Sequence, residues 1–182
     1  MPTGVRLYVL AGRGVDVSDN LVRLVLVRRD FVPEPEAQQE ARKLLASFVS
    51  LADEVDVETS EHVCFIDPGE HFEEVHCPFC GAMIDREWWN EAMAMAQQTN
   101  FTDLSVSMPC CAAGTSIDAL IYYRPAGFAG FELTARNPDD DLNATQLERL
   151  PELLQCELRK IWALIRGAIL KIARPIWKIG LP

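Results

Sequence analysis

Hydrophobic and polar residues alternate along several short stretches of the chain, and a period of two is typical of half-buried β-strands. In the N-terminal part this pattern predicts a strand over 5–10, and we expect a second strand over 21–27 to pair with it as a hairpin. It predicts a third strand over 55–58, followed by a short apolar run over 63–66. Cys64, within this run, is expected to be a small core residue.

Three further stretches, 104–108, 116–123 and 128–135, follow one another in the second half of the chain. The residues at 124–127 include Pro125 and Gly127, which are typical of a turn between the last two. We therefore predict that the three stretches form an antiparallel meander.

Apolar residues recur at helical spacing in two stretches of the central region. One follows the segment 33–36, whose proline and glutamate residues suit the first turn of a helix. The other follows Asp85, a favourable N-cap, and carries the adjacent pair Trp88-Trp89. We expect the tryptophans to anchor a core.

The longest helical pattern lies near the C-terminus. A capping-box spacing predicts one short turn over 145–149, because Pro151 would interrupt a longer helix there. From Pro151, helical spacing of apolar residues continues to about Ala173. Residues 158–182 hold six basic residues and no acid, so we predict a basic amphipathic C-terminal helix or tail. It would pack on the acidic body, form a homodimer contact or lie on an anionic membrane surface.

The overall composition is that of a globular protein with an acidic body. The 182 residues carry a formal net charge of -10, and the first 157 hold 11 basic and 27 acidic residues. This balance disfavours nucleic-acid binding, which needs a basic face, and suits a basic protein partner. We see neither a signal-peptide pattern nor an apolar run of membrane-spanning length, so we expect a cytoplasmic location, where clustered cysteines bind metals rather than form disulfides.

Four of the six cysteines fall into two clusters that predict a metal site. Cys77 and Cys80 flank Pro78-Phe79 and are followed by Gly81, while Cys110 and Cys111 are adjacent and follow Pro109. Four thiolates at a turn-forming spacing are typical ligands of a structural Zn²⁺ ion. Whether both Cys110 and Cys111 bind is open, because adjacent residues of a regular strand point to opposite sides. His76 is the alternative ligand, and a redox dithiol at Cys77–Cys80 is the alternative chemistry.

Several of these motifs together resemble those of a known group of proteins. The Cys77-Pro-x-Cys-Gly knuckle, the Glu87-Trp88-Trp89 run, the Pro109-Cys110-Cys111 turn and the segment 125–129 resemble small bacterial zinc-ribbon-like proteins of unassigned function. The resemblance covers roughly residues 60–165 and implies a zinc ribbon but no activity. The second cysteine pair and the inserted helix depart from a standard ribbon.

The sequence thus predicts a single α+β domain over 1–182. It would contain antiparallel sheets, a zinc-ribbon-like four-cysteine centre over 77–111, an inserted aromatic helix and a long C-terminal helix. Since no His-Glu-x-x-His or other catalytic motif is present, we expect a non-catalytic protein-binding protein, for example an immunity or antitoxin-like inhibitor of a basic partner. The alternatives are an enzyme with a structural or three-ligand catalytic zinc, and nucleic-acid or membrane-surface binding through the basic C-terminal helix.

Overall fold

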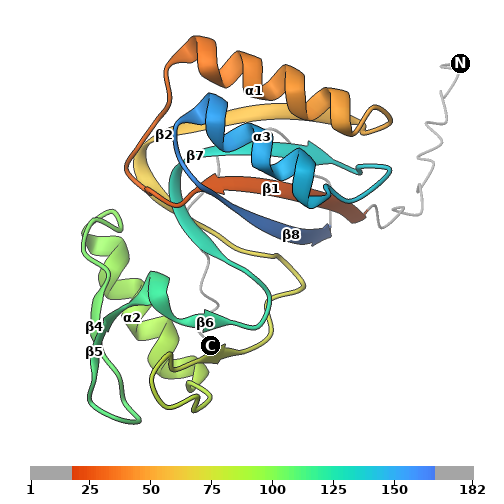
Figure 1. Cartoon of the computed structure of the whole chain (residues 1–182). Coiled ribbons are helices and arrows are strands. Elements are labelled where there is room, and N and C mark those ends of the chain that lie inside the picture. Colours follow the sequence, from red (N-terminus) through yellow and green to blue (C-terminus); the bar gives the residue numbers. More distant parts are fainter. Residues whose placement is uncertain (1–17, 167–182) are drawn as a thin grey trace, which may run out of the picture.

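The structure, a computed structural model, describes residues 18–166. Its larger part is a four-stranded antiparallel sheet of strand order β2-β7-β1-β8, and two helices lie along one face of this sheet (Figure 1). In chain order these elements are β1 (Ser18–Leu26), α1 (Pro35–Phe48), β2 (Glu54–Ile66), β7 (Gly127–Arg136), α3 (Ala144–Leu154) and β8 (Leu158–Arg166). This β-α-β-β-α-β order with β1 and β7 at the centre is the split βαβ arrangement of ferredoxin-like folds.

The face of the sheet beneath α1 and α3 forms the main hydrophobic core. Val22, Leu24 and Leu26 alternate along β1 and point toward the helices, where Leu45 of α1 and Leu150 of α3 are fully buried. The neighbouring strand β7 adds buried apolar residues to the same cluster. β1 is buried on both faces from Leu21 to Leu26, and its even-numbered positions face this core.

The opposite face of the sheet contains a buried ion pair. Arg23 of β1 is 1% exposed and forms a two-pronged ion pair with Glu132 of β7, one contact being Nη2 to Oε2 at 2.8 Å. Thr134 donates a further hydrogen bond of 2.7 Å to Glu132. Burial opposes the charge on Arg23, but the Glu132 carboxylate outweighs it and raises the arginine pKa. Arg23 Nη1 also donates to the backbone carbonyl of Asp67 at 3.1 Å, directly after β2 ends.

Residues 67–126, between β2 and β7, form an insert that lies beyond the ends of these two strands (Figure 1). In chain order it contains β3 (Val75–His76), α2 (Arg86–Gln98), β4 (Ser105–Ser107), β5 (Gly114–Ser116), the 3₁₀ turn η1 (Ile117–Ala119) and β6 (Ile121–Tyr122). β3 pairs with β6 and β4 pairs with β5, both antiparallel. A second core forms where Trp89 of α2 packs edge-on against Phe65 of β2, with ring centroids 5.8 Å apart.

The structure confirms the predicted helices of the central region. α1 begins at Pro35, inside the segment 33–36, and α2 carries the tryptophan pair. Asp85 is the N-cap of α2, and its carboxylate accepts hydrogen bonds from the backbone N–H groups of Glu87 and Trp88. Both signals act within one helical turn, which is why the sequence alone was sufficient.

The predicted long C-terminal helix is wrong over 158–166. The predicted short turn over 145–149, ending before Pro151, is wrong as well. α3 begins at a capping box formed by Asn143 and Gln146, continues through Pro151 and ends at Leu154; the next residue, Gln155, has a left-handed φ of 53°. The chain then forms β8, which pairs with β1 along its whole length. Strand pairing in the sheet has overridden the helical spacing of the apolar residues. The remainder of the predicted helix, 167–182, lies outside the described residues, as does the predicted strand over 5–10.

Two other predictions about strands are also wrong. The strand predicted at 21–27 is confirmed as β1, but the predicted hairpin is wrong because the two edges of β1 pair with β7 and β8. The predicted meander is divided between three sheets because β4 pairs with β5, β6 with β3 and β7 with β1 and β2. Cys64 is exposed rather than a core residue. The predicted strand at 55–58 and the apolar run at 63–66 belong to one strand, β2, whose pairing register shifts between Thr59 and Cys64. Among the described residues, no helix is long and apolar enough to cross a membrane.

Candidate metal centre

The first cysteine pair lies in a tight turn that directly follows β3. The backbone N–H of Gly81 donates to the carbonyl of Cys77 at 3.0 Å, and the N–H of Cys77 donates to the carbonyl of Ala82 at 2.9 Å. Gly81 has a φ of 71°, which a residue without Cβ adopts at little cost. The turn brings the side chains of Cys77 and Cys80 to the same side of the insert.

The second pair lies in a turn of the same construction between β4 and β5. Here the N–H of Ala112 donates to the carbonyl of Met108 at 2.9 Å, and the N–H of Met108 donates to the carbonyl of Ala113 at 2.9 Å. Ala112 has a φ of 57°, matching the left-handed conformation of Gly81. The segments Cys77–Ala82 and Met108–Ala113 are therefore two equivalent knuckles that face each other.

This equivalence explains the adjacent cysteines. Met108 occupies the position that Cys77 holds in the first knuckle, and Cys111 occupies the position of Cys80. The position of the first cysteine is thus occupied in the second knuckle by a buried methionine, 2% exposed. Cys110, at the position of Phe79, supplies the fourth sulfur instead. Because the chain bends through a turn here, adjacent side chains can reach the same point, as a straight strand would not allow.

The four sulfur atoms have the separations that a tetrahedral metal site requires. The Sγ atoms of Cys77 and Cys111 are 3.7 Å apart, those of Cys80 and Cys110 are 3.4 Å apart, and all four lie within 4.8 Å of one another. With zinc–sulfur bonds of about 2.3 Å, the edges of a tetrahedron would be about 3.8 Å. None of the four is in a disulfide. The four cysteines together could hold one metal ion.

The electrostatics of the cluster also favour a cation. Burial acts to raise the pKa of Cys77, but backbone hydrogen bonds from Cys80 and Phe79 outweigh it and lower the pKa to about 7. Burial and hydrogen bonds with Cys80, Cys77 and Cys111 raise the pKa of Cys110 to about 12. Four neighbouring thiols therefore cannot all ionise on their own, whereas a bound divalent cation would stabilise four thiolates.

The histidines lie apart from this sulfur cluster. His76 precedes Cys77, but its Nδ1 lies 3.0 Å from the carbonyl of Gly81 and its Nε2 lies 2.9 Å from Oε2 of Glu74. These contacts hold the imidazole against the first knuckle, and they raise its pKa. The grouping of potential ligands within the described residues contains Cys77, Cys80, Cys110 and Cys111 but not His76.

A set of exposed apolar residues lies beside this centre and was not predicted from the sequence. The backbone of His76 forms an antiparallel β-bridge with Met83 on one side and pairs with Ile121 of β6 on the other. Directly opposed residues share one face of an antiparallel sheet, so Met83, His76 and Ile121 form one outward row, which we call the apolar strip. Met83 is 65% exposed and Ile121 is 52% exposed. No local signal reveals this row, because its exposure depends on pairing between distant segments.

No family model, curated protein or solved structure matches this chain. The functional interpretation therefore depends on the geometry and chemistry of the site itself.

Proposed function

We propose that this protein is a non-catalytic binding protein whose insert, held together by a zinc ion on Cys77, Cys80, Cys110 and Cys111, docks a basic protein partner. The observation that carries the proposal is the apolar strip on an otherwise acidic insert. Exposed apolar groups that are gathered on one region mark interaction surfaces more often than scattered ones do.

The zinc assignment is supported by the ligand set. Four sulfur donors in a tetrahedral arrangement suit zinc or an iron–sulfur centre, and the two facing knuckles resemble those of structural zinc sites. A four-sulfur site leaves no coordination position for a substrate, which favours a structural role over catalysis.

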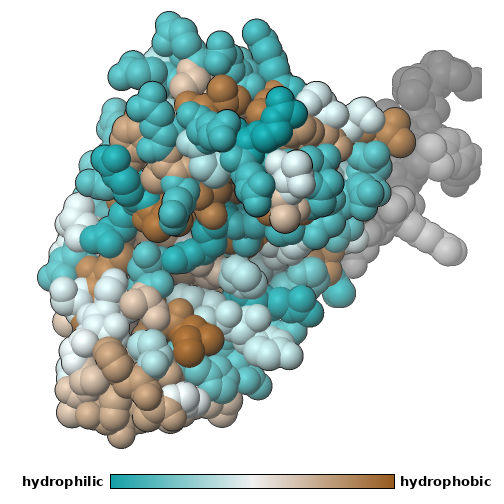
Figure 2. Space-filling view, in the orientation of Figure 1, coloured by the Kyte–Doolittle hydropathy of each residue, from teal (hydrophilic) through white to brown (hydrophobic). Residues whose placement is uncertain are grey.

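The distribution of exposed apolar residues supports a docking role for the insert. Large hydrophobic residues that are exposed in the described part of the chain include five in the insert, namely Phe79, Met83, Met95, Ile121 and Tyr123. In Figure 2 the lower part of the molecule, where Figure 1 places the insert, shows a broad tan and brown area. The upper part is mostly teal with scattered brown residues.

The charge of the insert supports a basic partner. Residues 67–126 contain nine acidic and two basic residues. Both basic side chains are engaged within the insert, because Arg86 stacks over Phe72 at 4.8 Å and Arg124 lies 3.8 Å from the carboxylate of Glu73. A partner with lysines and arginines around an apolar patch would complement this surface in charge as well as in hydrophobicity. A basic toxin or nuclease that the protein inhibits is one concrete form of such a partner.

The test is affinity capture from the native host with the zinc-loaded protein, combined with metal analysis. We expect one zinc per chain and retention of a basic protein that is released by moderate salt. The double variant Met83→Ser/Ile121→Ser should no longer retain this partner. The matched control is Leu51→Ser, which removes a side chain that lies outside the insert and is 75% exposed. This variant should still retain the partner.

The opposite results would overturn the proposal. They are a wild-type protein that retains no specific partner, or a partner that the double variant retains equally well. A site with only three cysteine ligands and a bound water would instead favour the alternative of a catalytic zinc.

A further inference from the structure

We propose that the cavity next to the apolar strip is a peptide-anchor site that takes one bulky aliphatic side chain flanked by lysine or arginine residues. This proposal specifies the chemistry of the partner in the proposed docking function, and it rests on that function for the identity of the partner. Its own existence is tested separately below, with peptides rather than with the native partner.

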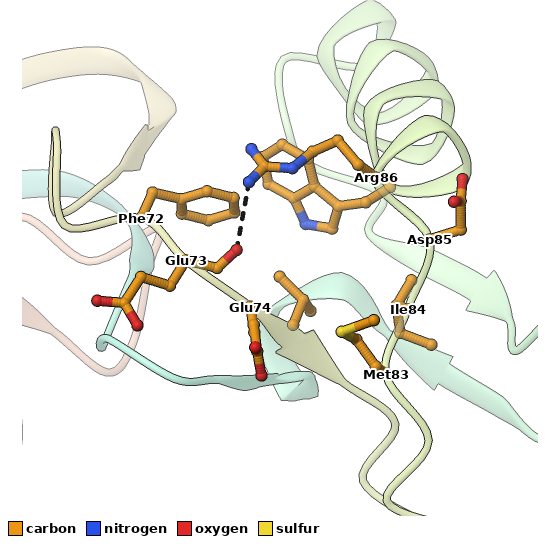
Figure 3. A pocket seen from close by; sticks show the side chains of 9 residues that line it. Phe72, Glu73, Glu74, Met83, Ile84, Asp85 and Arg86 are labelled. Carbon is orange, nitrogen blue, oxygen red and sulfur yellow. Dashed lines mark hydrogen bonds between the residues drawn. The ribbon is translucent and has the colours of Figure 1, made fainter.

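The cavity has a volume of about 290 Å³ and an apolar interior. Figure 3 shows the ring of Phe72 at one side, with Met83 and Ile84 at the other. The remaining apolar lining comes from Val75 and Trp89. This volume lies at the lower end of the range of small-molecule sites, about 300–1,000 Å³, and is sufficient for one bulky side chain.

The interior is held in place before any ligand binds. The N–H of Ile84 donates to the carbonyl of Val75 at 2.8 Å, which fixes the two sides of the cavity relative to each other. Arg86 stacks over Phe72 and donates a hydrogen bond of 3.2 Å to the carbonyl of Glu73, drawn as the dashed line in Figure 3. A preformed apolar pocket loses little conformational entropy on binding, which favours recognition of one anchor residue.

The rim carries the negative charge that would meet flanking cations. Glu73 and Glu74 are adjacent, and their side chains are 48% and 52% exposed. In Figure 3 both carboxylates point away from the apolar interior. Asp85 also lies on the rim, but its carboxylate caps α2. An apolar side chain in the cavity would leave its neighbouring residues close to these two carboxylates. Each carboxylate is partly exposed and already has one partner in the insert, Arg124 for Glu73 and His76 for Glu74.

The charge also argues against a second copy of this chain as the occupant. The net charge of the whole protein is -10, and the insert itself is acidic. Docking two such surfaces would bring like charges together at the rim, which is unfavourable at moderate ionic strength. The acidic surface around the cavity fits a basic segment, and a partner protein is the source that we propose for it.

The first test uses synthetic peptides and the full zinc-loaded protein. The probe peptide has a central leucine with two lysines on each side. We expect saturable NMR shifts of the Trp89 indole N–H and of the methyl groups of Val75 and Ile84. Replacing the central leucine by alanine should weaken binding about tenfold, because the buried apolar area is lost. Replacing the lysines by glutamates should abolish it.

Matched charge variants of the protein test the rim. Glu73→Gln/Glu74→Gln should weaken binding of the lysine–leucine peptide and reduce its dependence on salt. Glu87→Gln/Glu91→Gln removes the same charge from α2 without altering the lining of the cavity, and it should bind nearly as well as wild type. Equal losses in the two variants would mean that only the overall charge matters, and would overturn the proposed rim.

The remaining outcomes separate the two proposals. If Trp89 shows no saturable shift, or if the alanine peptide binds as tightly as the leucine peptide, the anchor site is wrong even where partner capture depends on Met83 and Ile121. If the peptide saturates Trp89 but no native partner is captured, the anchor site stands and the proposed function fails. A concentration-dependent shift of Trp89 without peptide, together with dimers in sedimentation, would identify a second copy as the occupant and overturn the proposal.

Discussion

The sheet layer and the insert of this protein are stabilised by different means. The sheet has strands of up to thirteen residues and a core that runs from β1 and β7 to α1 and α3. The insert has strands of only two or three residues. Such short pairings are not stable alone, so the insert depends on its aromatic core and on the cysteine cluster. A metal ion on the four cysteines would add to the stability that the aromatic core gives the insert.

The two regions meet at the ends of β2 and β7. Phe65 and Phe128 belong to these strands but are buried in the core of the insert, with ring centroids 5.0 Å apart. On the other face of the sheet, Arg23 connects Glu132 to the first residue of the insert, Asp67. The different stabilisation of the sheet and the insert can therefore be tested by removing the metal, by breaking the ion pair of Arg23 and by changing the knuckle turns.

Metal removal should have the largest effect, and it should be confined to the insert. We expect chelation or Cys77→Ser to abolish the packing of Trp89 while the sheet persists, because structural zinc contributes roughly 10–16 kcal/mol of apparent binding free energy in zinc-finger peptides. The measurement is NMR of the indole and backbone amides, in which Trp162 of β8 reports on the sheet.

The matched control is Cys64→Ser, which changes a cysteine outside the cluster and should leave zinc content and melting unchanged. A melting curve that does not respond to chelation would contradict the idea of a metal-dependent insert. Loss of the sheet together with the insert would contradict the independence of the two regions.

Breaking the buried ion pair should have the next largest effect, and it should act on both regions. We expect Arg23→Leu to destabilise the fold by about 3–5 kcal/mol, since Glu132 would be left charged and buried. Urea unfolding of the zinc-loaded protein measures this loss. The double variant Arg23→Leu/Glu132→Leu should recover most of it, because no uncompensated charge remains. Equal stability of the single and double variants would show that the charge is not the cause.

The smallest effects should come from the knuckle turns, with opposite signs. Ala112→Gly should stabilise the zinc-loaded protein by about 1 kcal/mol, because a residue with a Cβ is strained at a φ of 57°. Gly81→Ala should destabilise it by a similar amount for the same reason, although no atom lies within 4 Å of the added Cβ. Thermal melting at saturating zinc measures both. A destabilising Ala112→Gly would mean that the two knuckles are not equivalent.

The sequence by itself determined the features that depend on neighbouring residues. The start of α1 at its prolines, the cap of α2 at Asp85 and the grouping of Cys77 with Cys80 follow from chemistry within one turn of the chain. The acidic character of the insert likewise needs no structure. These signals were sufficient to predict a four-cysteine centre beside an aromatic helix.

The tertiary structure alone decided which distant segments meet. Residues 158–166 have helical spacing but form β8, because their backbone groups pair with β1 and the apolar side chains gain burial there. That Cys110 and Cys111 both lie beside Cys77 and Cys80 follows from the way the two turns face each other, which the sequence of either turn does not determine. The cavity beside Trp89 and the burial of Arg23 have the same origin, since each is formed by residues far apart in the chain.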